Sequence, residues 1–299
     1  MYIKHTVVNT FLMGKHTRVS DSDDDTVVRK RPRTEARQRL PSGATTAVLV
    51  RTYDPSRAAV ERLLDWANEL KVAEELNVDL WISIDVTLRR PGSDGKQTAA
   101  DGKKRKRLRC GATHENHFDG SVKDYISKQA LQRNLDVGKD IHVCEYTEAD
   151  MLRLYPSLSV CAEKTAYVNS KIKKRGRCSL AWGFHVEAIN YWFHTQPLQQ
   201  YTFVWVVEDD VGFSGDFAGF ISSYSSNEED LIYDTKTPVT DSWYWRDVHS
   251  PYFSASFTGR LVASEHVQRF SKKLLDCLHT LGKTHECHAW SESLVPSIA

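Results

Sequence analysis

The stretch Tyr201-Thr-Phe-Val-Trp-Val-Val-Glu-Asp-Asp-Val211 joins an apolar run to three consecutive acids. From Phe203 to Val207 it is apolar and rich in β-branched residues, which predicts a strand buried on both faces in a mostly parallel sheet. Glu208, Asp209 and Asp210 follow directly. Because acidic side chains are rarely buried without partners, we expect the strand to leave the core here and to end at a functional site.

Ligands of open α/β sheets bind just beyond the carboxyl ends of the strands, which is where these three acids are expected. Carboxylates crowded together repel one another, and a hard divalent cation such as Mg²⁺ or Mn²⁺ relieves that repulsion. The acidic tip therefore predicts a metal ion or a cationic ligand.

A second pattern, nearer the start of the chain, indicates the fold class. Strand-like runs at Ala47–Tyr53 and Asp79–Asp85 flank a helical pattern that begins after Asp54-Pro55, with Asp54 as its expected cap. Strand, helix and strand at this spacing form a right-handed βαβ unit. We therefore expect an α/β fold with a mostly parallel central sheet flanked by helices.

Followed by Val211-Gly212-Phe213, the acids Glu208-Asp209-Asp210 resemble the Glu-Asp-Asp form of the DXD motif in the GT-A glycosyltransferases. The resemblance implies a GT-A-like, Rossmann-related sheet and a transferase with Mn²⁺ or Mg²⁺ as cofactor. Its donor would be a nucleotide-diphosphate sugar, and its acceptor a glycan, a glycoprotein or a small molecule.

The same resemblance implies roles for individual residues. Asp210 would bind the metal directly, with Asp209 and Glu208 assisting at the metal or the donor. The ends of the first two strands would bind the nucleoside, which nominates Arg51, Thr52 and Asp85, although Asp85 is equally well explained as a turn cap. His288, in the closing segment, is a candidate for a further metal contact.

An inverting transfer also needs a general base for the acceptor hydroxyl. The candidates are Glu292, Asp241 and Asp247, and Glu292 comes first because Trp290 beside it could lower the local polarity and raise its basicity. A retaining transfer needs no such base, and the sequence leaves this open. The aromatic stretch 241–247 is either a platform for sugar rings or core filling.

Two other functions stay open at this point. A metal-dependent phosphatase or nuclease also uses acids at strand ends, but it normally draws further ligands from other strands. A non-catalytic GT-A-like protein could keep the acids as a structural network. Residues 1–43 are polar and are expected to form a disordered arm ahead of a single catalytic domain, 44–299.

Within that domain, we expect residues 44–211 to bind the nucleotide sugar, 88–120 to form a mobile insertion, and 212–299 to bind the acceptor. The later chain predicts a helix at 179–195 with Trp182 on its buried stripe, a strand at 252–257 and a long helix at 264–282. The chain then ends without a helical pattern, and we expect the full protein to continue.

Overall composition narrows the remaining functional classes. Basic and acidic residues nearly balance, 40 against 39, which gives no sign of a nucleic-acid partner. No stretch approaches the roughly 20 apolar residues of a membrane span. Six cysteines without the spacing of a zinc site are expected to be buried thiols. The localisation stays open: the absence of a recognisable leader or anchor indicates the cytoplasm, and a fragment could come from a protein of the secretory pathway.

Overall fold

A computed structural model describes residues 5–7, 45–53, 55–87, 121–171, 180–195, 201–213, 215–233, 236–243, 245–263 and 265–298. The expected insertion 88–120 lies outside these residues, as does the expected arm 1–43 apart from one short strand, His5–Val7, that pairs in the central sheet. No helix of the described chain is both long enough and apolar enough to span a membrane.

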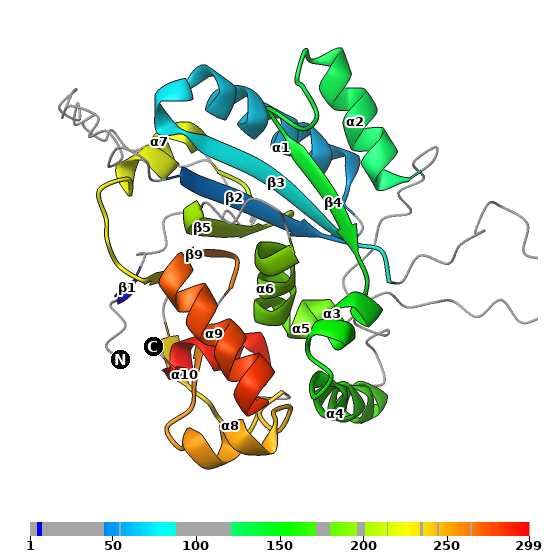
Figure 1. The fold of residues 1–299 in the computed structure, drawn as a ribbon, viewed down its shortest axis with the longest axis vertical. Coiled ribbons are helices and arrows are strands. Elements are labelled where there is room, and N and C mark those ends of the chain that lie inside the picture. Colours follow the sequence, from blue (N-terminus) through cyan, green and yellow to red (C-terminus); the bar gives the residue numbers. More distant parts are fainter. Residues whose placement is uncertain are drawn as a thin grey trace, which may run out of the picture.

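Seven strands form the central sheet in the order β1-β6-β9-β5-β2-β3-β4 (Figure 1). Neighbours among β4, β3, β2 and β5 run parallel, whereas β9 runs antiparallel to both β5 and β6. The sheet is therefore mostly parallel, as predicted. The strands span His5–Val7 (β1), Thr45–Thr52 (β2), Val78–Asp85 (β3), His142–Tyr146 (β4), Tyr201–Glu208 (β5), Leu231–Tyr233 (β6) and Val267–Ser271 (β9). A small separate sheet pairs β7 (Lys236–Pro238) with β8 (Leu261–Ala263).

Helices cover both faces of the sheet (Figure 1). Alternate residues of β2 point to opposite faces, as the period of a strand requires. Val48 and Val50 join the core under α1, α2 and α7, while Ala47 and Leu49 join the core under α6, α9 and α10. The helices are α1 (Arg57–Val72), α2 (Val122–Gln132), α3 (Glu148–Leu154), α4 (Leu158–Lys171), α5 (Leu180–Gly183), α6 (His185–Thr195), α7 (Phe217–Ser223), α8 (Pro251–Ser256), α9 (Lys272–His285) and α10 (Ser291–Ile298).

Local capping chemistry explains several boundaries. Ser56 caps α1, where its Oγ accepts from the backbone N–H of Ala59 at 3.0 Å. The cap expected at Asp54 lies outside the described residues. Among the described cysteines, Cys161 and Cys287 are buried free thiols as predicted, and two others are only partly buried.

The prediction of a strand at 252–257 is wrong, because this segment is helix α8. Its residues alternate between polar and apolar, but the residues just before them start a helix. The Oγ of Ser250 accepts from the backbone N–H of Phe253 at 3.3 Å, and Pro251 occupies the first helical position. A capping serine followed by proline is a helix start, and here it outweighs the alternation.

The helix predicted at 264–282 is wrong in its first part. Val267–Ser271 is strand β9, and α9 starts only after Ser271, whose Oγ caps the backbone N–H of Leu274 at 3.0 Å. The helix continues past Gly282 to His285. Five residues are too few to separate the period of a helix from that of a strand, and here pairing with β5 and β6 on both sides decides for the strand.

Two further elements differ from expectation. The helix predicted at 179–195 is interrupted at Phe184 into α5 and α6, and Trp182 is 37% exposed instead of lying on a buried stripe. The chain ends in helix α10, where no helix was expected. Both differences lie close to the acidic end of β5, and both matter for the site.

Candidate functional site

The residues nominated from the ends of the first two strands and of the acidic strand lie at one edge of the sheet. The parallel register places Arg51 of β2 opposite Glu208 of β5, with Thr52 directly after Arg51. Asp85 ends the adjacent strand β3. Because β9 is antiparallel, it begins at the edge where these strands end, and it brings His266 to the same place.

Glu208, Asp210 and His266 form the centre of this edge. One ligand-type atom from each of the three side chains lies within 4.8 Å of the others, the one such group of at least three among the described residues. The Nδ1 atom of His266 lies 2.8 Å from Oε2 of Glu208. Asp210 is exposed, and the other two side chains are partly exposed. The two carboxylates offer oxygen ligands and the imidazole offers one nitrogen ligand. This set of ligands suits Mn²⁺ and Mg²⁺.

The carboxylate of Asp209 turns back toward β2, where its Oδ2 accepts from the hydroxyl of Thr52. The guanidinium of Arg62, on α1, donates to the backbone carbonyl of Asp209 at 2.5 Å. The pKa of Asp209 is raised to about 6, mainly by burial and also by the charges of Asp210 and Glu208, while the hydrogen bond from Thr52 opposes the increase. The crowding inferred from the sequence is therefore present, and Asp209 acts as a brace between strands.

The electrostatics of His266 and Glu208 differ from those of Asp209. The hydrogen bond to Glu208 raises the pKa of His266 despite its partial burial. The pKa of Glu208 is lowered: burial opposes this, but the hydrogen bond and charge of His266 outweigh it. Each group therefore favours the charged form of the other, and the hydrogen bond keeps the Glu208 carboxylate in place at the end of β5.

Glu292, the first candidate for a general base, lies in the first turn of α10 near this group. Burial raises its pKa to about 7, with additional repulsion from Glu265 and Glu208. Two neighbours oppose the increase in this pKa: the side chain of Trp243 and the charge of His266. A carboxyl group with a pKa near neutrality is suited to take and release a proton.

A second layer of polar groups lies behind the exposed acids. Glu265 is buried, and Nε2 of His185 lies 3.0 Å from its Oε1, without the alignment of a hydrogen bond. Burial raises the pKa of Glu265 well above its usual range and lowers that of His185 to about 3, so His185 is neutral near pH 7. The sequence reasoning missed His266 and Glu265 because their segment was assigned to a helix.

Asp85 has one carboxyl oxygen engaged and one without a partner. Its Oδ1 accepts from the backbone N–H of Thr87 at 2.9 Å, which is the turn cap considered from the sequence. Its Oδ2 is buried and has no hydrogen-bond partner within the described chain. Buried polar atoms are normally satisfied, so an orphan oxygen at a ligand-binding edge is a candidate acceptor for a ligand's N–H or O–H group.

Three other candidates lie elsewhere. Asp241 and Asp247 are exposed and pair with Arg246, through Nη1 at 2.6 Å and Nε at 3.2 Å. His288 is completely buried; its Nδ1 donates to Glu187 at 2.8 Å, and its Nε2 lies 2.9 Å from the hydroxyl oxygen of Ser157. The structure does not bring these residues into the group of Glu208, Asp210 and His266.

No family model and no curated protein matches the chain. What can be said of its function therefore rests on the residues and their geometry.

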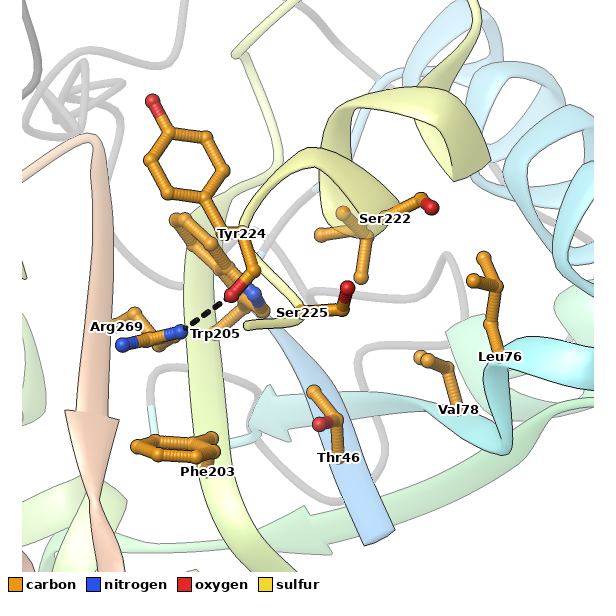
Figure 2. A pocket seen from close by; sticks show the side chains of 10 residues that line it. Thr46, Leu76, Val78, Phe203, Trp205, Ser222, Tyr224, Ser225 and Arg269 are labelled. Atoms are coloured by element: carbon orange, nitrogen blue, oxygen red, sulfur yellow. Dashed lines mark hydrogen bonds between the residues drawn. The ribbon is translucent and has the colours of Figure 1, made fainter. Parts of the chain in front are cut away.

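A pocket lies at the opposite edge of the sheet, where the parallel strands begin (Figure 2). Thr46, Val78 and Phe203 line it from the starts of β2, β3 and β5, and Arg269 of β9 lies over the ring of Phe203, 4.2 Å from its centroid. The guanidinium donates to the backbone carbonyl of Tyr224 at 3.0 Å. It also donates to Asn227 and Glu229. Arg269 therefore fastens the segment after α7 to the sheet.

Proposed function

We propose that the protein is a metal-dependent glycosyltransferase of the GT-A type, which moves a sugar from a nucleotide-diphosphate sugar to an acceptor hydroxyl. The observation that carries the proposal is the group of Glu208, Asp210 and His266 at the carboxyl edge of a mostly parallel sheet. Acids at this edge are where an α/β sheet offers a ligand site, and the resemblance of Glu208-Asp209-Asp210 to the DXD motif names the ligand.

The donor set fits a divalent cation. Glu208 and Asp210 would supply carboxylate oxygens, and His266 would supply a nitrogen after releasing its proton to the solvent. Mn²⁺ accepts a nitrogen ligand more readily than Mg²⁺, so Mn²⁺ is the preferred candidate. When bound, such a cation offsets the negative charge that grows on a departing diphosphate. Asp209 does not compete for this role in the present arrangement, because Thr52 holds its carboxylate toward β2.

The neighbouring strand ends support a nucleoside site. Asp85 offers a buried oxygen without a partner, which suits an N–H or hydroxyl group of a nucleoside. Arg51 supplies a positive charge beside Glu208, and one of its N–H groups already donates to the carbonyl of Ala181. In this proposal Asp85 binds the nucleoside, and Arg51 helps to hold the edge of the site in shape.

Glu292 is the proposed base in an inverting transfer. Its carboxylate would take the proton of the acceptor hydroxyl as the hydroxyl oxygen bonds to the anomeric carbon, while the bond from that carbon to the diphosphate breaks. A pKa of about 7 keeps a substantial share of Glu292 ionised near neutral pH. Asp241 and Asp247 support this role less well, because both are exposed and paired with Arg246.

A donor screen tests the proposal. The protein is incubated with Mn²⁺ and a panel of nucleotide-diphosphate sugars, and release of the nucleoside diphosphate is measured beside cleavage of a phosphomonoester and of DNA. Turnover of at least one sugar nucleotide, lost in Asp210→Asn and kept in Asp241→Asn, supports the transferase. Cleavage of the phosphomonoester or DNA alone would assign the site to a phosphatase or nuclease instead.

A further inference from the structure

Trp182 is placed unusually for a large apolar side chain. It lies in the four-residue helix α5, whose other residues, Leu180, Ala181 and Gly183, are all buried, whereas Trp182 is 37% exposed. Exposing part of an indole forgoes some of the stabilisation that its burial would bring. A segment that buries its small residues and exposes its largest one suggests that the indole has a task at the surface.

The backbone of α5 is held rigidly at the carboxyl edge of the sheet. The guanidinium of Arg51 donates to the carbonyl of Ala181, and the backbone N–H of Leu180 donates to Oε1 of Glu148 at 2.5 Å. On the other side, a Cβ atom at Gly183 would lie only 2.3 Å from the ring of Trp290. Contacts from β2, from α3 and from the segment before α10 therefore fix where Trp182 stands.

Trp182 also belongs to an aromatic cluster that continues toward Glu292. Its ring stands edge-on to Trp290 at 5.4 Å and to Trp245 at 6.3 Å, and those two rings stack on each other at 3.7 Å. Trp245 and Trp290 are buried, so the core-filling interpretation holds for Trp245. Glu292 follows Trp290 by two residues, and Trp243 lies close enough to its carboxyl group to lower the pKa of that group.

We propose that Trp182 is a stacking platform for a pyranose ring, and that the acceptor at this site is a carbohydrate. This inference rests on the proposed function and names its acceptor class. A pyranose presents a flat patch of C–H groups, which packs on an indole face, and a rim of hydroxyl groups, which needs carboxylates and N–H groups. Trp182 supplies the first, and the carboxyl group of Glu292 supplies the second.

The position of Trp182 favours the acceptor over the nucleoside of the donor. The indole packs on Trp245 and Trp290, which belong to the same half of the chain as Glu292. The orphan oxygen proposed for the nucleoside belongs to Asp85, at the end of β3. A lipid acceptor would favour a larger apolar surface than one partly exposed indole beside a carboxyl group.

Trp182→Ala and Trp182→Phe test the inference. Tyr252→Ala is the matched control, since Tyr252 is similarly exposed, at 39%, and stacks on His285 of α9. The probes are methyl glycosides and simple disaccharides. Their binding is followed by saturation-transfer NMR, and transfer kinetics are measured with the donor found in the screen. We expect Trp182→Ala to raise the acceptor KM about tenfold with kcat within about twofold. Trp182→Phe should lie in between, and Tyr252→Ala should match the wild type.

The outcomes separate this inference from the proposed function. If the protein turns over a donor but Trp182→Ala does not change the acceptor KM, the inference about Trp182 is wrong and the proposed transferase activity is still supported. If saccharide binding depends on Trp182 but the protein turns over no donor, the saccharide site is supported and the proposed transferase activity is wrong. If the wild-type protein neither binds a saccharide nor transfers a sugar to one, the inference is wrong. If a nucleobase displaces the saccharide and abolishes its NMR signal, Trp182 belongs to the donor site instead.

Discussion

Glu208 and His266 are joined twice, once through their side chains and once through the backbone. The Nδ1 atom of His266 lies 2.8 Å from Oε2 of Glu208, and the backbone N–H of Glu208 donates to the carbonyl of His266 at 3.1 Å. The second bond continues the antiparallel pairing of β5 with β9 by one step. The pair is therefore built by the sheet, and its geometry does not depend on a loop.

Replacement of His266 by alanine is expected to weaken Mn²⁺ binding by at least about tenfold, because it removes the imidazole nitrogen and the partner that keeps Glu208 ionised. Calorimetric titration with Mn²⁺ measures this. His285→Ala is the matched control, since that histidine is exposed at the end of α9. Equal Mn²⁺ affinity in the wild type and His266→Ala would remove His266 from the proposed site.

Asp210→Asn is expected to abolish the Mn²⁺-dependent binding of a nucleoside diphosphate while leaving the fold intact. The residue is exposed and follows the core part of β5, so the free energy of unfolding should change by less than about 0.5 kcal/mol. Titrations with and without Mn²⁺, together with urea unfolding, separate the two effects. Asp241→Asn serves as the exposed control. A nucleoside diphosphate that binds the variant as tightly as the wild type contradicts the role of Asp210.

Glu292 should impose a pH dependence on stability. Its folded pKa, about 7, is raised above the ordinary 4.5, so its contribution is fully present below pH 4.5 and is lost as pH rises through 7. Glu292→Gln cannot ionise. Relative to the wild type, its free energy of unfolding should therefore increase between pH 4.5 and 8, by on the order of 2 kcal/mol. Urea unfolding at several pH values measures this difference. A difference in unfolding free energy that stays constant with pH would contradict the prediction.

The same variant tests the catalytic role. In an inverting enzyme, Glu292→Gln should lower kcat by roughly 10²- to 10⁴-fold while donor binding stays near wild type. The wild-type rate should rise as pH increases toward 7 and above, because the ionised carboxylate is the base. A variant whose kcat and pH profile match those of the wild type would exclude Glu292 as the base.

His288 is expected to stabilise the fold. It is completely buried, and removing it would leave the carboxylate of Glu187 buried without its partner. His288→Ala should therefore reduce the free energy of unfolding by about 3 kcal/mol, against almost no change for His285→Ala. Urea unfolding compares the two variants. If His288→Ala instead unfolds like the wild type and loses Mn²⁺ binding, the ligand role considered from the sequence is the correct one.

Gly183→Ala should disturb the packing next to Glu292, because the added Cβ would lie 2.3 Å from the rigid ring of Trp290. The expected cost is about 1–3 kcal/mol of unfolding free energy. Gly215→Ala is the control, since nothing lies within 4 Å of the corresponding Cβ there. Equal thermal unfolding of the two variants would show that α5 and Trp290 are not packed as described.

Much of the fold follows from local patterns. The apolar run before Glu208 is a strand, the βαβ unit is present, and the serine and threonine caps at Ser121 and Thr147 start α2 and α3. Strand composition and caps act within a few residues, so they can be read without the fold. The errors fall where neighbouring strands outweigh a local pattern, as at 267–271, or where a local cap outweighs alternation, as at 252–257.

The sequence by itself determined that an acidic tip ends a buried strand and that Arg51, Thr52 and Asp85 end strands of the same sheet. Only the tertiary structure decided which other side chains meet them there. His266 reaches Glu208 across 58 positions of the chain, and it does so because β9 enters the sheet antiparallel and begins where β5 ends. Strand direction and order depend on pairing between distant segments, and a periodicity read over five to ten residues carries no information about that pairing.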